Sequence, residues 1–164
     1  MTDPDLKILP AGAAEAAALV ALIAGFRDHL RAATPSDTEI ERRLPGVLAD
    51  PAIEYLCAWQ GGRPVGYAQL RFWSSVWAGG TEVQLDDLFV VPPARGRKVG
   101  RALLRHALAR AAARGARRFG LNTNEQNETA QALYRSEGLT PQSHALYPAG
   151  REVFWVKDLG APPQ

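Results

Sequence analysis

A basic loop that leads into a helix is the stretch of sequence whose residue types most clearly suggest chemistry. Two prolines follow an apolar run, and residues 95–101 then have the sequence RGRKVGR. Unpaired N–H groups and the helix dipole attract anions to the start of a helix. The two glycines permit close backbone approach, and the arginine and lysine side chains add charge that suits phosphates. The loop therefore predicts a phosphate site.

Two common phosphate-binding motifs do not match this loop. A P-loop requires G-x-x-x-x-G-K-[ST] and a dinucleotide fingerprint requires three spaced glycines, and residues 96–101 provide neither. The loop instead resembles the [QR]-x-x-G-x-[GA] pyrophosphate loop of the GNAT superfamily, with Lys98 in place of the middle glycine. A second segment, NETAQALYRSEGL from Asn127, resembles the N-x-x-A-x-x-L-Y-x-x-x-G-[FL] segment of that superfamily at every signature position. The resemblance is clear over residues 82–139.

The resemblance implies acetyl-CoA as cosubstrate. No metal is expected, because the single cysteine and the scattered histidines match no metal-binding spacing. The pantetheine arm would pair with the backbone of a strand near residues 88–90, and the pyrophosphate would lie on N–H groups of residues 96–101. Asn127 would donate a hydrogen bond to the pantetheine, and Ala130 would leave room beside it. The expected cofactor-binding residues are Leu88, Phe89, Val90, Arg95, Gly96, Arg97, Lys98, Val99, Gly100, Arg101, Asn127 and Ala130.

The resemblance also implies two catalytic side chains. Tyr134 occupies the position of the usual general acid, which gives a proton to the leaving thiolate, although it could instead simply pack a helix onto the sheet. The run LDDLFV resembles L-E-D-[LF]-F-V of the diamine and polyamine branch, where the first acid is the base, and this predicts Asp86. Asp87 and Glu82 are reserves, and a structural or solvated carboxylate is the alternative. Because strand side chains alternate, only one of two adjacent acids faces the cleft unless a bulge intervenes.

Charge is distributed unevenly along the chain. Nine basic and no acidic residues lie between Arg95 and Arg118, although the net charge of the whole chain is only +2. We expect acetylation of a primary amine, on a small cationic or amino-acid-like acceptor rather than on a protein N-terminus or lysine. Two alternatives from other classes are a nucleic-acid-binding domain that uses residues 95–118 and a non-catalytic acetyl-CoA sensor. Under the main interpretation, the protein is not expected to bind nucleic acid.

Hydrophobic periodicity and turn residues predict the elements that position these residues. Helices are expected at 13–30, from Ser36 or Asp37 to Leu48, at 99–114 and at 127–137, and strands at 53–60, 65–75, 82–91, 119–123, 139–147 and 152–159. The fold class is α/β (α+β), a mixed and mostly antiparallel sheet with helices on both faces. The resemblance adds six to seven strands and a splayed central pair.

Length and composition are those of one globular domain, residues 1–164, with 159–164 as a flexible tail. No apolar run is long enough to span a bilayer and no signal peptide is apparent, so a cytoplasmic location without a membrane partner is expected. A homodimer is a possibility from the family's habit. The single cysteine, Cys57, lies in an apolar strand and is expected to be a core residue.

Overall fold

The computed structural model describes residues 5–141, which fall into two compact units, 5–124 and 125–141. The strands of the first unit are β1 (Leu6–Ala11), β2 (Ile53–Gln60), β3 (Arg63–Ser75), β4 (Gly80–Val90) and β5 (Ala116–Leu121). Its helices are α1 (Ala16–His29), α2 (Asp37–Leu48) and α3 (Val99–Ala113), with short 3-10 turns at Ala13–Glu15 and Pro92–Ala94. The second unit contains α4 (Glu128–Ser136). Each unit is described separately.

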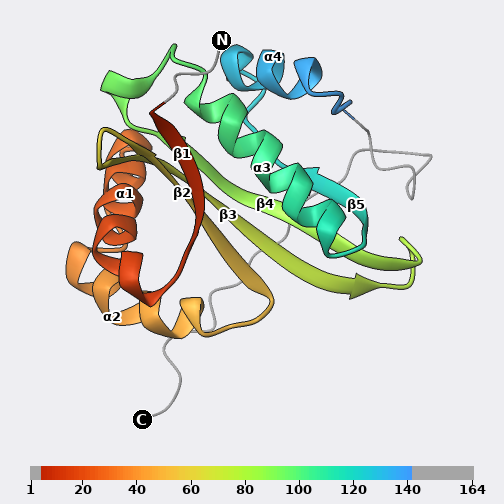
Figure 1. Cartoon of the computed structure of the whole chain (residues 1–164), viewed down its shortest axis with the longest axis horizontal. Helices are drawn as coiled ribbons and strands as arrows, with labels where there is room; N and C mark the ends of the chain where they lie inside the picture. The colour runs from red at the N-terminus through yellow and green to blue at the C-terminus, as the bar shows by residue number, and fades with distance from the viewer. Residues whose placement is uncertain (1–4, 142–164) are drawn as a thin grey trace. The chain divides into compact units, whose positions relative to one another are not determined.

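The sheet of the first unit has its strands in chain order, β1-β2-β3-β4-β5 (Figure 1). Neighbouring strands are antiparallel except β4 and β5, which are parallel and are joined through α3. A parallel neighbour needs a crossover connection, which α3 supplies. This is the mixed, mostly antiparallel sheet that the sequence predicted.

The count and ends of the strands differ from the expectation. The described residues contain five strands, of which β1 was not predicted. It pairs with β2 from Leu6 opposite Gln60 to Ala11 opposite Tyr55, and its Pro10 obscured the alternation of the segment. The strand predicted at 152–159, and 142–147 of the one predicted at 139–147, lie outside the described residues. Residues 139–141 are not in a strand.

The first two helices pack on one face of the sheet. Helix α2 begins with a capping box, in which the Ser36 hydroxyl accepts from the Glu39 N–H and the Glu39 carboxylate accepts from the Ser36 N–H. Together the helices cover a buried cluster to which the strands contribute mainly aromatic side chains. Its members are Leu19, Leu22, Leu44, Tyr55, Cys57, Tyr67 and Phe89.

Helix α3 packs on the opposite face. Strand residues alternate between faces, so Gly66 faces away from its neighbour Tyr67, and a Cβ added at Gly66 would lie 3.2 Å from Leu103 of α3 and 2.6 Å from the Phe89 carbonyl oxygen. Only glycine allows this close approach. The arrangement agrees with the predicted helices on both faces (Figure 1). Among residues 5–141 no helix combines the length and apolarity needed to cross a membrane.

Candidate active site

A β-bulge in β4 brings two carboxylates to one face of the sheet. The register pairs Gln69 with Asp87 and Leu70 with Leu85, so that Asp86 has no partner in β3. The extra residue interrupts the alternation of side chains. Asp86 and Asp87 therefore both reach residues of β3 on the face that α1 and α2 cover.

Asp86 is held by a two-pronged ion pair. Arg71 Nε lies 2.9 Å from Oδ2 of Asp86, and Arg71 Nη2 lies 2.8 Å from Oδ1. Gln69 Nε2 also approaches Oδ2 at 3.4 Å. Both carboxylate oxygens of the predicted base are thus engaged by donors, while the Arg71 side chain remains 54% exposed.

Asp87 has a different environment. Its Oδ2 accepts a hydrogen bond of 2.9 Å from the Tyr67 hydroxyl, and it forms no ion pair with the described residues. Burial raises the pKa of Asp87, and the nearby charge of Asp86 raises it further, against the effect of the Tyr67 hydrogen bond. Beside this pair, the Tyr55 hydroxyl donates to Gln69 Oε1 at 2.6 Å. Burial likewise raises the pKa of both tyrosines, so both hydroxyls remain protonated donors at neutral pH.

Beyond the bulge, the edge of β4 that faces away from β3 pairs with no other described strand; we call it the open edge. Pairing with β5 ends at Leu85 opposite Leu121, whereas β4 continues to Val90. The Val91 N–H bonds to the Val65 carbonyl on the β3 side, so by alternation the backbone groups of Val90 face the open edge. The edge of residues 86–90 has no β-ladder partner within the described part of the chain, which fits the predicted splay.

The backbone of the basic loop is left-handed at two residues. Gly96 has φ +76°, with no atom within 4 Å of a Cβ added there, and Lys98 has φ +66° just before α3 begins at Val99. The first turn of α3 contains no acidic residue. The side chains of Arg97 and Lys98 are exposed.

Arg95 lies back against β4. Its Nε donates to the Val90 carbonyl at 2.9 Å, and its guanidinium is 5.8 Å from the centre of the Phe89 ring. The Phe89 ring is stacked on Phe26 at 5.3 Å. The ring therefore points into the core, and by the same alternation the backbone groups of Phe89 face β3 rather than the open edge.

In the second unit, the side chain of Asn127 caps the start of α4. Asn127 Oδ1 accepts from the Ala130 N–H at 3.1 Å, so this side chain closes the first turn of the helix. Tyr134 lies further along α4 and is half-buried. Burial raises the pKa of Tyr134, which keeps the phenol protonated at neutral pH.

Three residues of this site were missed by sequence reasoning, namely Tyr67, Gln69 and Arg71. They alternate along β3, which is otherwise mostly apolar, in the sequence YAQLRFW. Polar groups recurring on one face of a strand were the available signal.

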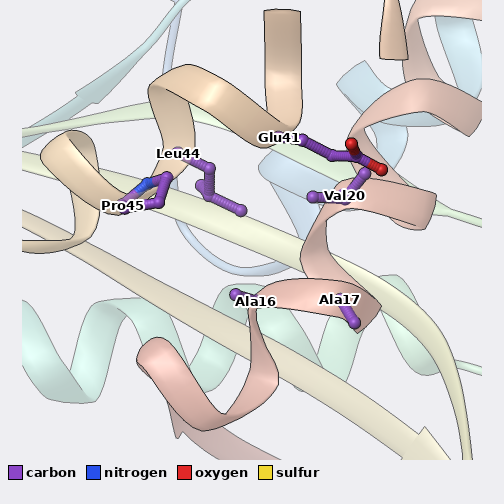
Figure 2. Close-up of a pocket in the computed structure, with 6 residues that line it drawn as sticks. All are labelled: Ala16, Ala17, Val20, Glu41, Leu44 and Pro45. Atoms are coloured by element: carbon purple, nitrogen blue, oxygen red, sulfur yellow. The ribbon is translucent and has the colours of Figure 1, made fainter. Parts of the chain in front are cut away.

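The structure also has a hollow between α1 and α2, lined by Ala16, Ala17, Val20, Glu41, Leu44 and Pro45 (Figure 2). It shares no residue with the bulge and contains one carboxylate.

Comparisons with known proteins agree with this geometry. The model of the acetyltransferase (GNAT) family matches residues 21–139. An uncharacterised N-acetyltransferase of Mycobacterium tuberculosis is 35% identical over 96 residues, which cover 58% of each chain. Aminoalkylphosphonate N-acetyltransferase of Salmonella typhimurium is 35% identical over 101 residues, 59% of this chain and 62% of the relative. These matches thus span less than two thirds of either relative.

The fold has close counterparts among solved structures. The crystal structure of a probable acetyltransferase superposes with a TM-score of 0.82 at 23% identity, covering 93% of this chain and 99% of the other. This likeness concerns the fold alone. The match to the family model covers most of the chain and includes the bulge, the basic loop and the segment that begins at Asn127. The chain therefore belongs to the acetyltransferase (GNAT) family.

Proposed function

We propose that the protein transfers the acetyl group of acetyl-CoA to the primary amine of a small cationic or amino-acid-like acceptor. The observation that carries the proposal is the bulge at Asp86. It coincides with the end of β4–β5 pairing, so an open strand edge and two carboxylates occur at the same point of the sheet.

The residues present fit acetyl-CoA. At the open edge, the backbone groups of Leu88 and the N–H of Val90 suit an extended pantetheine arm, which would pair there as an added strand does, while the Val90 carbonyl is engaged by Arg95. The N–H groups from Gly96 to Arg101 suit a pyrophosphate, because a loop with two left-handed residues opens there into the start of α3. Arg97 and Lys98 add positive charge. The bound cosubstrate supplies an acetyl thioester.

Tyr134 and the bulge carboxylates are the proposed proton donor and acceptor. A phenol that stays protonated at neutral pH can protonate a departing thiolate, and the raised pKa of Tyr134 suits that role. The acceptor arrives mostly as an ammonium ion, since the pKa of an alkylamine is about 10.4, and it must lose a proton before its nitrogen can form the amide bond. A carboxylate of the bulge would take that proton.

Charge around the bulge supports a cationic acceptor. Arg71 neutralises Asp86, and Arg118 lies 3.4 Å from Glu82. Asp87 is left as a carboxylate without a cationic partner among residues 5–141, so it can attract an ammonium group. Amino-acid-like acceptors are further supported by the resemblance to the aminoalkylphosphonate N-acetyltransferase.

A panel of amines tests this proposal. Purified protein and acetyl-CoA would be incubated with diamines, amino acids, aminoalkylphosphonates, aminoglycosides and short peptides, and thiol release and product mass would be measured. We expect acetylation of a small amine. Modification of peptides alone would favour the protein acetyltransferase alternative, and no transfer to any amine would contradict the proposal.

A further inference from the structure

We propose that Asp87, rather than Asp86, takes the proton from the acceptor amine, and that Arg71 is the positioning residue that separates the roles of the two acids. This inference rests on the proposed acetyl transfer. It departs from the expectation that the first acid of the LDDLFV run is the base.

Arg71 occupies both oxygens of Asp86, and Gln69 adds a longer contact to Oδ2. An acceptor ammonium group would have to displace one of these charge-assisted hydrogen bonds, which are about twice as strong as neutral ones, before it could contact Asp86. The two-pronged geometry also fixes the plane of the carboxylate, so Asp86 serves as a fixed negative charge beside its neighbour.

Asp87 has the features of a base. Only Oδ2 is engaged, by the Tyr67 hydroxyl, and Oδ1 has no hydrogen-bond partner among the described residues. The tyrosine fixes the orientation of the carboxylate while leaving the other oxygen available. Burial raises the pKa of Asp87, which favours its accepting a proton.

The charged and titratable groups around Asp87 come from several elements. Tyr55 of β2, Tyr67 of β3 and Asp86 of β4 act on it, and Arg71 of β3 is bound to Asp86. His29 of α1 lies 6.1 Å from the neighbouring Phe89 ring. The two tyrosines stay protonated, and Arg71 keeps its charge because Asp86 raises its pKa. Asp86, which Arg71 holds in place, is therefore the charged neighbour that acts on Asp87.

In the proposed step, Oδ1 of Asp87 accepts one proton from the ammonium group of the acceptor. The freed lone pair of the nitrogen forms the new bond to the acetyl carbon as the carbon–sulfur bond breaks. The thiolate takes up a proton and the nitrogen loses its second N–H proton, which leaves the amide and the free thiol. Asp87 then releases its proton to solvent, so one proton is produced for each amide formed.

Three matched variants test this assignment in the full chain. We expect Asp87→Asn to lower kcat by roughly 100-fold or more, the usual contribution of a general base. Asp86→Asn should lower kcat by less, and should move the acid limb of the pH–rate profile to lower pH because a neighbouring negative charge is lost. Arg71→Gln should move that limb to higher pH, because the charge of Asp86 is then no longer balanced.

The assignment would be overturned if Asp86→Asn abolished turnover while Asp87→Asn retained it. A second readout does not depend on activity. Carbon-13 NMR of labelled aspartate carboxyls should show a resonance with raised pKa that disappears in Asp87→Asn and persists at a lower pKa in Asp86→Asn. Persistence of that resonance in Asp87→Asn would also contradict the assignment. Failure of the wild-type protein to acetylate any amine would instead count against the proposed function.

Discussion

At the scale of single residues, the backbone of Lys98 is in a conformation that glycine adopts more easily. Its φ of +66° is left-handed, a conformation that costs an L-residue roughly 1–2 kcal/mol. The superfamily motif places a glycine here, and the structure gives the physical reason. The loop backbone is left-handed here although the residue is lysine, and this strain lowers the stability of the fold.

Lys98→Gly should therefore stabilise the fold. Relief of the left-handed strain is partly offset by the greater freedom of glycine in the unfolded chain, and a net gain of about 0.5 kcal/mol is expected. Gly96→Ala, at φ +76°, should destabilise it by about 1 kcal/mol. Urea unfolding of both variants measures this, and equal effects of the same sign would contradict the account.

Tyr134→Phe tests the proposed acid. We expect kcat to fall by roughly 100-fold or more, since the phenol proton is lost, while the affinity for acetyl-CoA stays nearly unchanged. Steady-state kinetics and calorimetry measure the two quantities. A parallel loss of both, with a lower unfolding midpoint, would mean that Tyr134 has a packing role only.

Asp87→Asn has a consequence for stability. The pKa of Asp87 is raised in the folded protein. Its carboxylate therefore binds a proton more tightly in the folded state than in the unfolded chain, where the pKa of an aspartate is about 3.9. Stability from this group is present at low pH and is lost as pH rises through the folded pKa. The variant should be more stable than the wild type at pH 7 and lose that advantage at acid pH. Urea unfolding that showed lower stability at pH 7 would contradict the raised pKa.

At the scale of elements, the sequence predicted those helix and strand ends that depend on residues close together in the chain. Ser36 and Asp37 were the two predicted caps of α2, and Ser36 is the one used, in a capping box whose partners lie within one turn. The ends of β2 were also predicted, since Asp50-Pro51 and Gly61-Gly62 bound a run of apolar and aromatic residues. Strand β1 was missed, because a short segment containing a proline has little periodicity of its own.

The bulge could not be assigned to a residue from the sequence. Its position depends on the register of β3 against β4, which is set by packing on both faces. The superfamily resemblance suggested a bulge somewhere in this strand and predicted the two carboxylates. It could not predict that Arg71 would pair with Asp86 and Tyr67 with Asp87.

The start of α3 supplies a test of the phosphate site. Gly100→Glu puts a carboxylate in the first turn, and it should abolish acetyl-CoA binding through repulsion of the pyrophosphate and steric conflict. Ala109→Glu, on the exposed side of the same helix, adds the same charge and should leave binding within a few-fold. Calorimetric titration compares the two variants. Tight binding by Gly100→Glu would mean that the phosphates lie elsewhere.

At the scale of the whole molecule, the basic segment 95–118 is less available than its composition suggests. Arg110 forms an ion pair with Glu54, and Arg114 lies 3.7 Å from the centre of the Phe72 ring and donates to the Pro51 carbonyl. With Arg118 paired to Glu82, several charges of the segment are neutralised internally, which disfavours a nucleic-acid surface.

Cys57 reports on the integrity of the core. It is fully buried, as the sequence predicted, and burial raises the pKa of its thiol to about 11. We expect no reaction with a thiol reagent in the native protein and one equivalent after denaturation, because only the thiolate reacts. The absorbance of the chromophore that the reagent releases measures the extent of reaction in the native and the denatured protein. Rapid reaction of the native protein would contradict the buried position, and slow reaction leaves thiol-release assays free of background.

Calorimetric titration of the wild-type protein with acetyl-CoA, with free coenzyme A alongside, tests the central claim most directly. It requires no knowledge of the acceptor. We predict one binding site of micromolar affinity. The absence of binding by the folded protein would contradict the assignment of the open β4 edge and the basic loop to acetyl-CoA, and with it the proposed acetyl transfer.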